Sequence, residues 1–361
     1  MNPMIQLQKA TAHNWSITIR NILQLIDLMK TPMGYRIPLL NPASILAICL
    51  SLSTLLLLPP RASATSFFFS TGAPDGKIGT LSSPASSELT ETETADDFVL
   101  SECVVINQAT FTGLLPSGTP VANITDVEVE FYHVFPTDSD TNRTITVPTR
   151  VDSPADVEIA SATRNSSNDF TAKVVNAVFS VNNSVVTGIN PIPNQFTGGE
   201  GPVTGEEVTI TVTFKPPILL AAGHYFIVPE VGLSSGNFLW LSAPLPIVAP
   251  GTPFTPDFES WIRNDNIAPD WLRIGTDITH MGPFNASFSL SGETGAMSII
   301  NQLVPCSGPA TGGTWKNHGQ YVSAVAHAAH TLASLGCISE QEKGKIVSAA
   351  AKSSCGKKKH L

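Results

Sequence analysis

Short segments in which apolar and polar residues alternate recur over residues 67–292. The clearest is EEVTITVTFK at 206–215, where Val208, Ile210 and Val212 alternate with threonines. Successive side chains of a strand point to opposite faces of a sheet, so this period of two predicts a strand with one buried face. The same pattern predicts strands in QATFTGLL, DVEVEFYHVF, AKVVNAVFSV, GHYFIVPEV, NFLWLSA and NASFSLSG.

The connections between these segments are rich in proline and glycine, as in PIPNQFTGGEGPVTG and PLPIVAPGTPFTP. Proline and glycine are disfavoured inside strands and helices, so these stretches are predicted to be loops. Many strands, long loops and no intervening helices predict that 65–295 is a mainly β domain. We expect a jelly-roll-like antiparallel β-sandwich.

The pattern changes at the C-terminal end of the chain. Residues 296–313 contain PCSGPATGGT and are interpreted as a linker. The segment GQYVSAVAHAAHTLASLG predicts a helix that ends at Gly336, because glycine is favoured just past a helix end. A second helix is predicted to begin at Ser339, with Glu342 at the spacing of a capping box. The short connection makes 314–361 an α-helical hairpin module.

An apolar run at 45–58 precedes the sandwich and is followed by Pro-Pro and Ala-Ser-Ala. These features are typical of a secretory signal peptide. The run is shorter than the roughly 20 residues that a membrane-spanning helix needs, so no membrane anchor is expected after cleavage. We interpret 33–64 as the signal peptide and 1–32 as an over-extended N-terminus. The expected product begins at Thr65 and is secreted, either extracellular or periplasmic.

The 20 basic and 29 acidic residues are unevenly distributed. Residues 65–312 hold 8 basic and 26 acidic residues, whereas residues 313–361 hold 7 and 2. Nucleic-acid binding depends on a basic surface, so the acidic sandwich is not expected to bind nucleic acid. The basic tail is suited to contact with the acidic domain or with an anionic polymer.

Four of the five cysteines lie beyond the apolar run, at Cys103, Cys306, Cys337 and Cys355. An even number in an exported chain favours disulfides. In an antiparallel hairpin the end of the second helix returns to the start of the first, which predicts the bond Cys306–Cys355. Cys337 lies at the opposite turn and is predicted to be free or paired with Cys103.

The segment WKNHGQYVSAVAHAAH carries three histidines, His318, His327 and His330. At about 100° per residue their side chains diverge around a helix, so they cannot together bind one zinc ion. We interpret His327 and His330 as solvated and His318 as a hydrogen-bonded structural residue. The sequence GLSSG around Ser234 fits a nucleophile elbow, but a strand instead of a helix is predicted to follow it.

The sequence DSDTN places Asp138, Asp140 and Asn142 at the alternate positions that begin a calcium loop. The glycine expected next is Arg143, and position twelve is Thr149 instead of glutamate, which excludes an EF-hand. Two interpretations remain. One is a looser site for a structural calcium ion, and the other is an ordinary loop of Asx turns.

The segment SWIRNDNIAPDWLRIGTD combines two aromatic rings, Trp261 and Trp271, with two cations, Arg263 and Arg273. Exposed aromatic rings stack on sugar faces, and jelly rolls carry ligands on loops or on one sheet face. These four residues are therefore the predicted ligand-binding site. The alternative is that the rings hold a large loop in place from its interior. For Trp240 in FLWLS, a core position is favoured.

Several runs resemble those of a family of secreted bacterial β-sandwich proteins with a C-terminal module of the WKNHGQYVS type. They include TADDFVL, TFTGLLPSGTP, HYFIVPEV and TWKNHGQYVSAVAHAA, and the resemblance extends over nearly all of the chain beyond residue 64. The resemblance implies architecture and export, and it implies no activity. Ala324 departs from the pattern, because a relative is expected to carry cysteine there, and this leaves an inherited disulfide pairing open.

These patterns favour an exported, non-catalytic surface, matrix or carbohydrate-binding protein, with polysaccharide or cell-surface components as partners. Paired carboxylates are abundant, but none can be singled out as an acid/base pair, so no catalytic residue is assigned. One alternative is a secreted polysaccharide-active hydrolase, which would need two carboxyls facing each other in an acidic cleft. The other is an extracellular metal-binding protein, which would need converging histidine and aspartate side chains.

Overall fold

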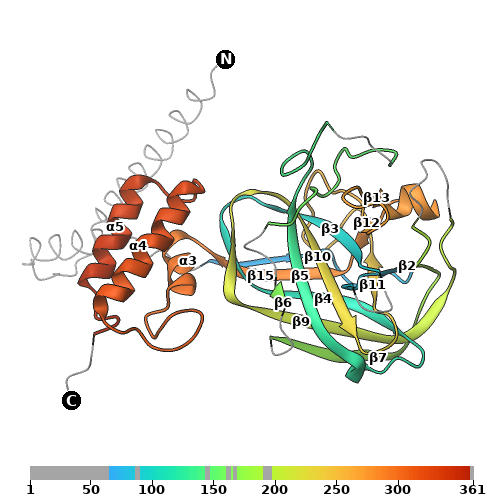
Figure 1. Ribbon diagram of the computed structural model, residues 1–361, viewed down its shortest axis with the longest axis horizontal. Coiled ribbons are helices and arrows are strands. Elements are labelled where there is room, and N and C mark those ends of the chain that lie inside the picture. The colour runs from blue at the N-terminus through green and yellow to red at the C-terminus, as the bar shows by residue number, and fades with distance from the viewer. Residues whose placement is uncertain are drawn as a thin grey trace, which may run out of the picture. The chain divides into compact units, whose positions relative to one another are not determined.

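The computed structural model describes residues 65–85, 90–142, 147–159, 164–165, 169–189 and 197–357. Within these residues the strands form a nine-stranded and a six-stranded sheet that pack face to face (Figure 1). Strands β2 and β8 pair in parallel, and the other described pairs are antiparallel. The predicted mainly β fold, an antiparallel sandwich followed by helices, is confirmed. The predicted signal peptide and N-terminal extension lie outside the described residues.

The nine-stranded sheet has the order β1-β15-β4-β11-β2-β8, with β9 between β4 and β7 and with β14 beside β11. Its long strands β4 and β9 include the predicted strands QATFTGLL and EEVTITVTFK. The strands are β1 (Thr65–Ser70), β2 (Ile78–Leu81), β4 (Val104–Pro116), β7 (Phe170–Val181), β8 (Asn183–Val185), β9 (Val203–Leu220), β11 (Leu239–Ala243), β14 (Asn285–Ala286) and β15 (Phe288–Thr294).

The six-stranded sheet has the order β13-β12-β3-β10-β5-β6. Short 3₁₀ and π turns, Val121–Asn123 and Ile274–Thr279, adjoin its strands. The strands are β3 (Thr92–Leu100), β5 (Ile124–His133), β6 (Arg164–Asn165), β10 (Gly223–Leu233), β12 (Trp261–Asn264) and β13 (Leu272–Arg273).

The core between the sheets is formed by the alternate apolar residues that predicted the strands. In β9, Val208, Ile210 and Val212 are buried in this core. Aromatic residues from five other strands join them, namely Phe98, Phe111, Phe131, Trp240 and Phe288. Trp240 is fully buried, which confirms the core position favoured for it.

Three helices follow the sandwich in the described part of the chain: α3 (Ala296–Leu303), α4 (His318–Ser334) and α5 (Glu340–Lys352). Helix α3 lies in the segment that was interpreted as a linker. Its buried Ile299 and Ile300 share an apolar cluster with Val105 of the sandwich and with residues of α4 and α5. The proline- and glycine-rich stretch begins only at Pro305, so the first part of the segment is free to form a helix.

The ends of the helical hairpin follow the predicted capping signals. Ser339 accepts a hydrogen bond from the backbone N–H of Glu342, whose side chain accepts one in return. Gly336 has φ of +74°, and the N–H of Cys337 donates to the carbonyl of Leu332. No helix in the described residues is long and apolar enough to cross a membrane.

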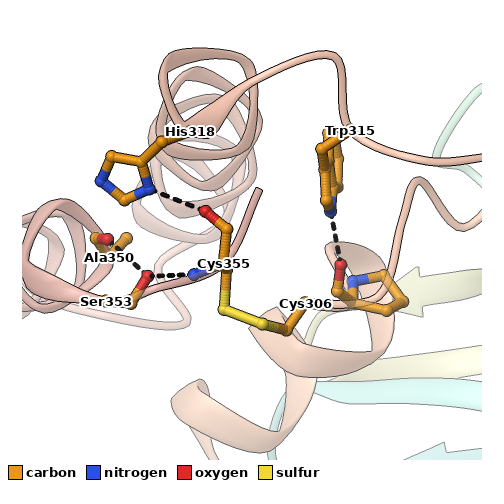
Figure 2. Close-up of a disulfide and its surroundings, with 7 residues drawn as sticks. Cys306, Trp315, His318, Ala350, Ser353 and Cys355 are labelled. Carbon is orange, nitrogen blue, oxygen red and sulfur yellow. Dashed lines mark hydrogen bonds between the residues drawn. A yellow bond between two sulfur atoms is a disulfide. The ribbon is translucent and has the colours of Figure 1, made fainter. Parts of the chain in front are cut away.

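Two disulfides join the four cysteines. Cys306–Cys355 has the predicted pairing, and Cys103–Cys337 is the alternative that was left open for Cys337. Figure 2 shows the first bond beside His318, whose Nδ1 lies 2.7 Å from the carbonyl oxygen of Cys355. The second bond links the start of β4 to the turn between α4 and α5. Two disulfides are typical of a protein that folds in an oxidising compartment.

Candidate functional site

Trp261 and Trp271 are each 1% exposed, so neither ring is available to stack on a ligand. Both pack on the outer face of the six-stranded sheet, in a cluster with Tyr132 and Phe226. Trp271 Nε1 donates to the carbonyl of Ala155 at 3.2 Å. The prediction of an exposed ring pair is wrong because a distant segment of the chain covers this face. The alternative, aromatic residues that hold a loop from within, is the one observed.

The two cations of the predicted ligand site are committed to internal ion pairs. Arg263 donates through Nε and Nη2 to the carboxylate of Glu93, and its Cζ lies 4.3 Å from the centre of the Trp271 ring. Arg273 donates to both carboxylate oxygens of Asp277, at 3.0 and 2.7 Å. The prediction that Arg263 and Arg273 bind an external ligand is therefore corrected, because both guanidinium groups bind carboxylates of the protein itself.

The DSDTN loop has the hydrogen bonds of an Asx turn. Asp140 Oδ1 accepts from the backbone N–H of Asn142 at 2.9 Å, and Asp138 Oδ2 lies 2.5 Å from His133 Nδ1. Residues 143–146 lie outside the described part. Among the described residues, no three His, Cys, Asp or Glu side chains are arranged to hold a metal ion. The observed bonds are therefore those of the ordinary loop, and a structural calcium remains a prediction.

The histidines of the C-terminal module lie as predicted. His327 and His330 are exposed. His318 lies between the start of α4 and the end of α5, with its ring nitrogens 2.7 and 3.0 Å from the carbonyl oxygens of Cys355 and Ala351. Ser234 lies in the turn between β10 and β11, so a strand follows it and the nucleophile-elbow interpretation has no supporting helix.

The ADDF motif holds loops to the sandwich from the middle of β3. Asp96 accepts from the Ser260 hydroxyl at 2.9 Å and from the Ala286 N–H at 3.0 Å. Asp97 Oδ2 lies 2.5 Å from His224 Nε2 and accepts from the Phe258 N–H at 3.1 Å. Burial raises the pKa of Asp97 to about 6, against the lowering effect of its hydrogen bond to His224. The motif therefore has a structural role in the observed fold.

Four glutamates gather on the outer face of the six-stranded sheet, which the sequence did not predict. They are Glu93 on β3, Glu128 and Glu130 on β5, and Glu230 on β10. The strand register places Glu230 opposite Glu128. Like charges in such cross-strand positions destabilise a sheet. Arg263 on β12 lies opposite Glu93 on β3 and forms an ion pair with it. It is the positively charged residue that the described contacts place among these glutamates.

Burial changes the protonation of this glutamate cluster. Burial and, to a smaller extent, the negative charges of Glu93 and Glu130 together raise the pKa of Glu230 to about 10. Glu230 is 1% exposed, and its Oε1 has no hydrogen-bond partner among the described residues. Glu93 and Glu230 are both buried, whereas Glu128 and Glu130 are half-buried.

Replacing Glu230 by glutamine should make the folded protein less sensitive to alkaline pH. A carboxyl whose pKa is higher in the folded than in the unfolded state binds the proton more tightly when folded. Its contribution to stability is complete below pH 4.5 and is lost as pH rises toward the folded value of about 10. We expect Glu230→Gln to stabilise the protein at pH 8 by on the order of 2 kcal/mol relative to wild type, and not at pH 4.

Urea unfolding at both pH values measures this difference. The exposed Glu340→Gln provides the control for a change of net charge, since the Glu340 side chain is 75% exposed. Equal stability of Glu230→Gln and wild type at pH 8 would show that Glu230 carries no extra proton in the folded state.

The outer face of the nine-stranded sheet presents a second array of polar side chains. The register aligns one hydroxyl-bearing residue from each of five neighbouring strands. We call this set the hydroxyl row; it consists of Ser70, Ser289, Thr110, Thr211 and Thr171 on β1, β15, β4, β9 and β7. Each of these residues is exposed or half-exposed, and the hydroxyls of Thr110 and Thr211 are 3.0 Å apart.

A parallel row begins at an exposed aromatic residue. Phe68 on β1 is 60% exposed and lies opposite Ser291, which pairs with Gln108, which pairs with Thr213. At the far end of both rows the surface is hollowed by a cavity of about 210 Å³. The cavity is lined by Gln108, Asp169, Phe170, Thr171, Thr211, Thr213 and Lys215.

The alternation in EEVTITVTFK predicted that the threonines of this segment point away from the core. It did not predict that they align with serines from distant segments, because that alignment depends on the order of the strands in the sheet. The threonines of β9 and β4 are about 100 residues apart in sequence and come together only in the sheet. A scan of protein-family models and a search of curated protein sequences found no match to the chain. The resemblance to secreted β-sandwich proteins therefore stays an expectation.

Proposed function

We propose that the protein is an exported, non-catalytic, carbohydrate-binding protein that holds a neutral polysaccharide on the outer face of its nine-stranded sheet. The observation that carries this proposal is the hydroxyl row, which places a hydrogen-bonding group on five successive strands. The predicted signal peptide and the two disulfides support an extracellular location.

The chemistry of this face matches that of a sugar chain. A serine or threonine hydroxyl both donates and accepts a hydrogen bond, as a sugar hydroxyl does. The exposed ring of Phe68 can stack on the apolar face of a pyranose. The charged side chains at the cavity, Lys215 and Asp169, lie 4.0 Å apart and offset each other. A ligand that is itself uncharged suits this surface better than a polyanion.

The spacing of the rows favours a chain that crosses the strands. Neighbouring strands lie about 4.8 Å apart, which is close to the length of one sugar in an extended β-linked chain. Each sugar would then meet one strand. Because sheets twist by about 20–25° per strand, a stiff chain should lie closest to the strands in the middle of the row, which are β15, β4 and β9.

Removing the two central hydroxyls should weaken binding without unfolding the protein. The double variant Thr110→Val and Thr211→Val keeps the β-branched shape and loses both hydroxyls. We expect about a tenfold loss of affinity for a soluble neutral β-glucan, measured by affinity electrophoresis or calorimetry. Phe68→Ala should act in the same direction. Thr331→Val, at an exposed site on α4, provides the matched control and should bind as wild type does.

The competing interpretations give different outcomes in the same assay. Release of reducing ends from the glucan would show a hydrolase. Stronger binding to a polyuronate than to a neutral glucan would contradict the choice of ligand. Failure of the protein to bind any glycan in a panel of neutral and acidic polysaccharides would reject the proposed function.

A further inference from the structure

The hydrogen bonds of Tyr132 require a proton on one of two neighbouring glutamates. The Tyr132 hydroxyl lies 2.7 Å from Glu93 Oε1 and 2.6 Å from Glu130 Oε2. A phenol has one proton, and an ionised carboxylate only accepts hydrogen bonds. Arg263 Nη2, at 3.0 Å, is a donor and already uses a lone pair of the phenol oxygen. The second short contact therefore needs a carboxyl that donates.

Glu130 is the carboxyl that carries this proton. Glu93 accepts two hydrogen bonds from the guanidinium of Arg263, and such a bidentate pair stabilises the carboxylate form. The described partner of Glu130 is the Tyr132 hydroxyl. The bonds then run in one direction, from Glu130 to Tyr132 to Glu93. Burial raises the pKa of Glu130 to about 7, with the hydrogen bond to Tyr132 acting against this rise and the charge of Glu93 acting with it.

A segment that covers the sheet is bonded to the same residues. We call residues 153–159 the cover segment. The carbonyl of Asp156 accepts from Arg263 Nη1 at 3.1 Å, and the N–H groups of Ala155 and Ile159 donate to carbonyls of β5. The cover segment also carries Glu158, whose charge acts on Glu130. Through Arg263, the cover segment is therefore bonded to the same residue that bonds the Tyr132 hydroxyl.

We propose that Glu130 is a proton-operated latch, which keeps the cover segment on the sheet while it is protonated and releases the segment when the proton is lost. The groups that face Glu130 are Glu93 on β3, Glu128 and Tyr132 on β5, Glu230 on β10, Arg263 on β12 and Glu158 on the cover segment. Arg263 is already paired with Glu93, so a new charge on Glu130 repels Glu158 and weakens the attachment of the cover segment.

The latch is independent of the proposed glycan binding, because it lies on the six-stranded sheet and the hydroxyl row lies on the other one. Its direction follows from the raised pKa. The folded protein holds the proton at acidic and neutral pH and loses it as pH rises through about 7. An exported protein experiences such changes in its surroundings, so the cover segment would open in an alkaline medium.

Hydrogen exchange of the peptide that contains the cover segment tests the latch. After correction for the intrinsic exchange rate, we expect protection of the Ala155 and Ile159 amides to fall about tenfold between pH 6 and pH 8. Glu130→Gln keeps a donor toward Tyr132 and cannot ionise, so its protection at pH 8 should equal that at pH 6. Glu206→Gln, the same chemical change on the other sheet, should behave as wild type does.

Either of two results would overturn the latch. One is wild-type protection that does not change between pH 6 and pH 8, and the other is a Glu130→Gln variant with the wild-type dependence on pH. If Glu130→Gln does not fold, Glu158→Gln replaces it in the test. Removing the charge of Glu158 removes the repulsion that opens the segment, so protection in this variant should not change between pH 6 and pH 8, and a retained wild-type dependence on pH would contradict the proposal.

Discussion

Replacing Trp271 by alanine should lower the free energy of unfolding by about 3–5 kcal/mol, the cost of removing a large buried aromatic side chain. The ring is 1% exposed, lies beneath the guanidinium of Arg263 and meets the Tyr132 ring edge to face, with 5.7 Å between ring centres. Its Nε1 also holds the carbonyl of Ala155 in the cover segment. Loss of the ring therefore leaves a cavity and frees a buried carbonyl. Urea unfolding followed by circular dichroism measures the change.

Phe68→Ala is the matched control, because it truncates an aromatic side chain that is 60% exposed. Its stability should stay within about 0.5 kcal/mol of wild type, as is usual for surface substitutions. Trp271→Ala should therefore lower stability and leave glycan binding to the folded protein unchanged, whereas Phe68→Ala should leave stability unchanged and weaken glycan binding. A Trp271→Ala protein with wild-type stability would contradict the burial of this ring, and it would restore the idea of an exposed stacking platform.

The strands could be predicted from the sequence because one face of each is buried and the other is solvated. In β9 the alternation of valine and isoleucine with threonine is the direct result of that environment. The pairing Cys306–Cys355 could be predicted for a similar reason, since the geometry of a helical hairpin brings two distant positions together. Both inferences use only local pattern and short-range topology.

The role of Trp261 and Trp271 could not be predicted, because both faces of β12 are covered. Ile262 packs on one side of the strand and Trp261 on the other, so its sequence, WIRN, does not alternate between apolar and polar residues. The cover comes from Ala155, which is 116 residues away from Trp271. A tryptophan among polar residues then has the same local sequence whether it is a binding platform or part of a core.

The glutamate cluster was missed for a related reason. Glu128 and Glu130 occupy the alternate positions of DVEVEFYHVF, a pattern that predicts solvated carboxylates. The structure places them beside Glu230 and Glu93 on neighbouring strands, where both are half-buried. Strand order and register decide which charges become neighbours, and a sequence pattern within one strand does not contain either of them.

Removing the Cys306–Cys355 bond should destabilise the helical module by about 4 kcal/mol, because the bond closes a loop of about 50 residues and restricts the unfolded chain. The double variant Cys306→Ser and Cys355→Ser keeps the polar contacts around the bond, including the one from His318 to the Cys355 carbonyl (Figure 2). Urea unfolding followed by far-ultraviolet circular dichroism should show earlier loss of the helical signal than of the β signal.

The second disulfide provides the comparison that identifies the cause. Cys103–Cys337 ties the module to the sandwich, and Val105, Ile299 and Ile300 form an apolar cluster with α4 and α5 beside it. The variant Cys103→Ser and Cys337→Ser leaves the hairpin bond intact, so within the module the helices should still unfold together. Coincident loss of helical and β signals in the Cys306→Ser and Cys355→Ser variant, at the wild-type urea concentration, would show that packing of this cluster alone holds the hairpin closed.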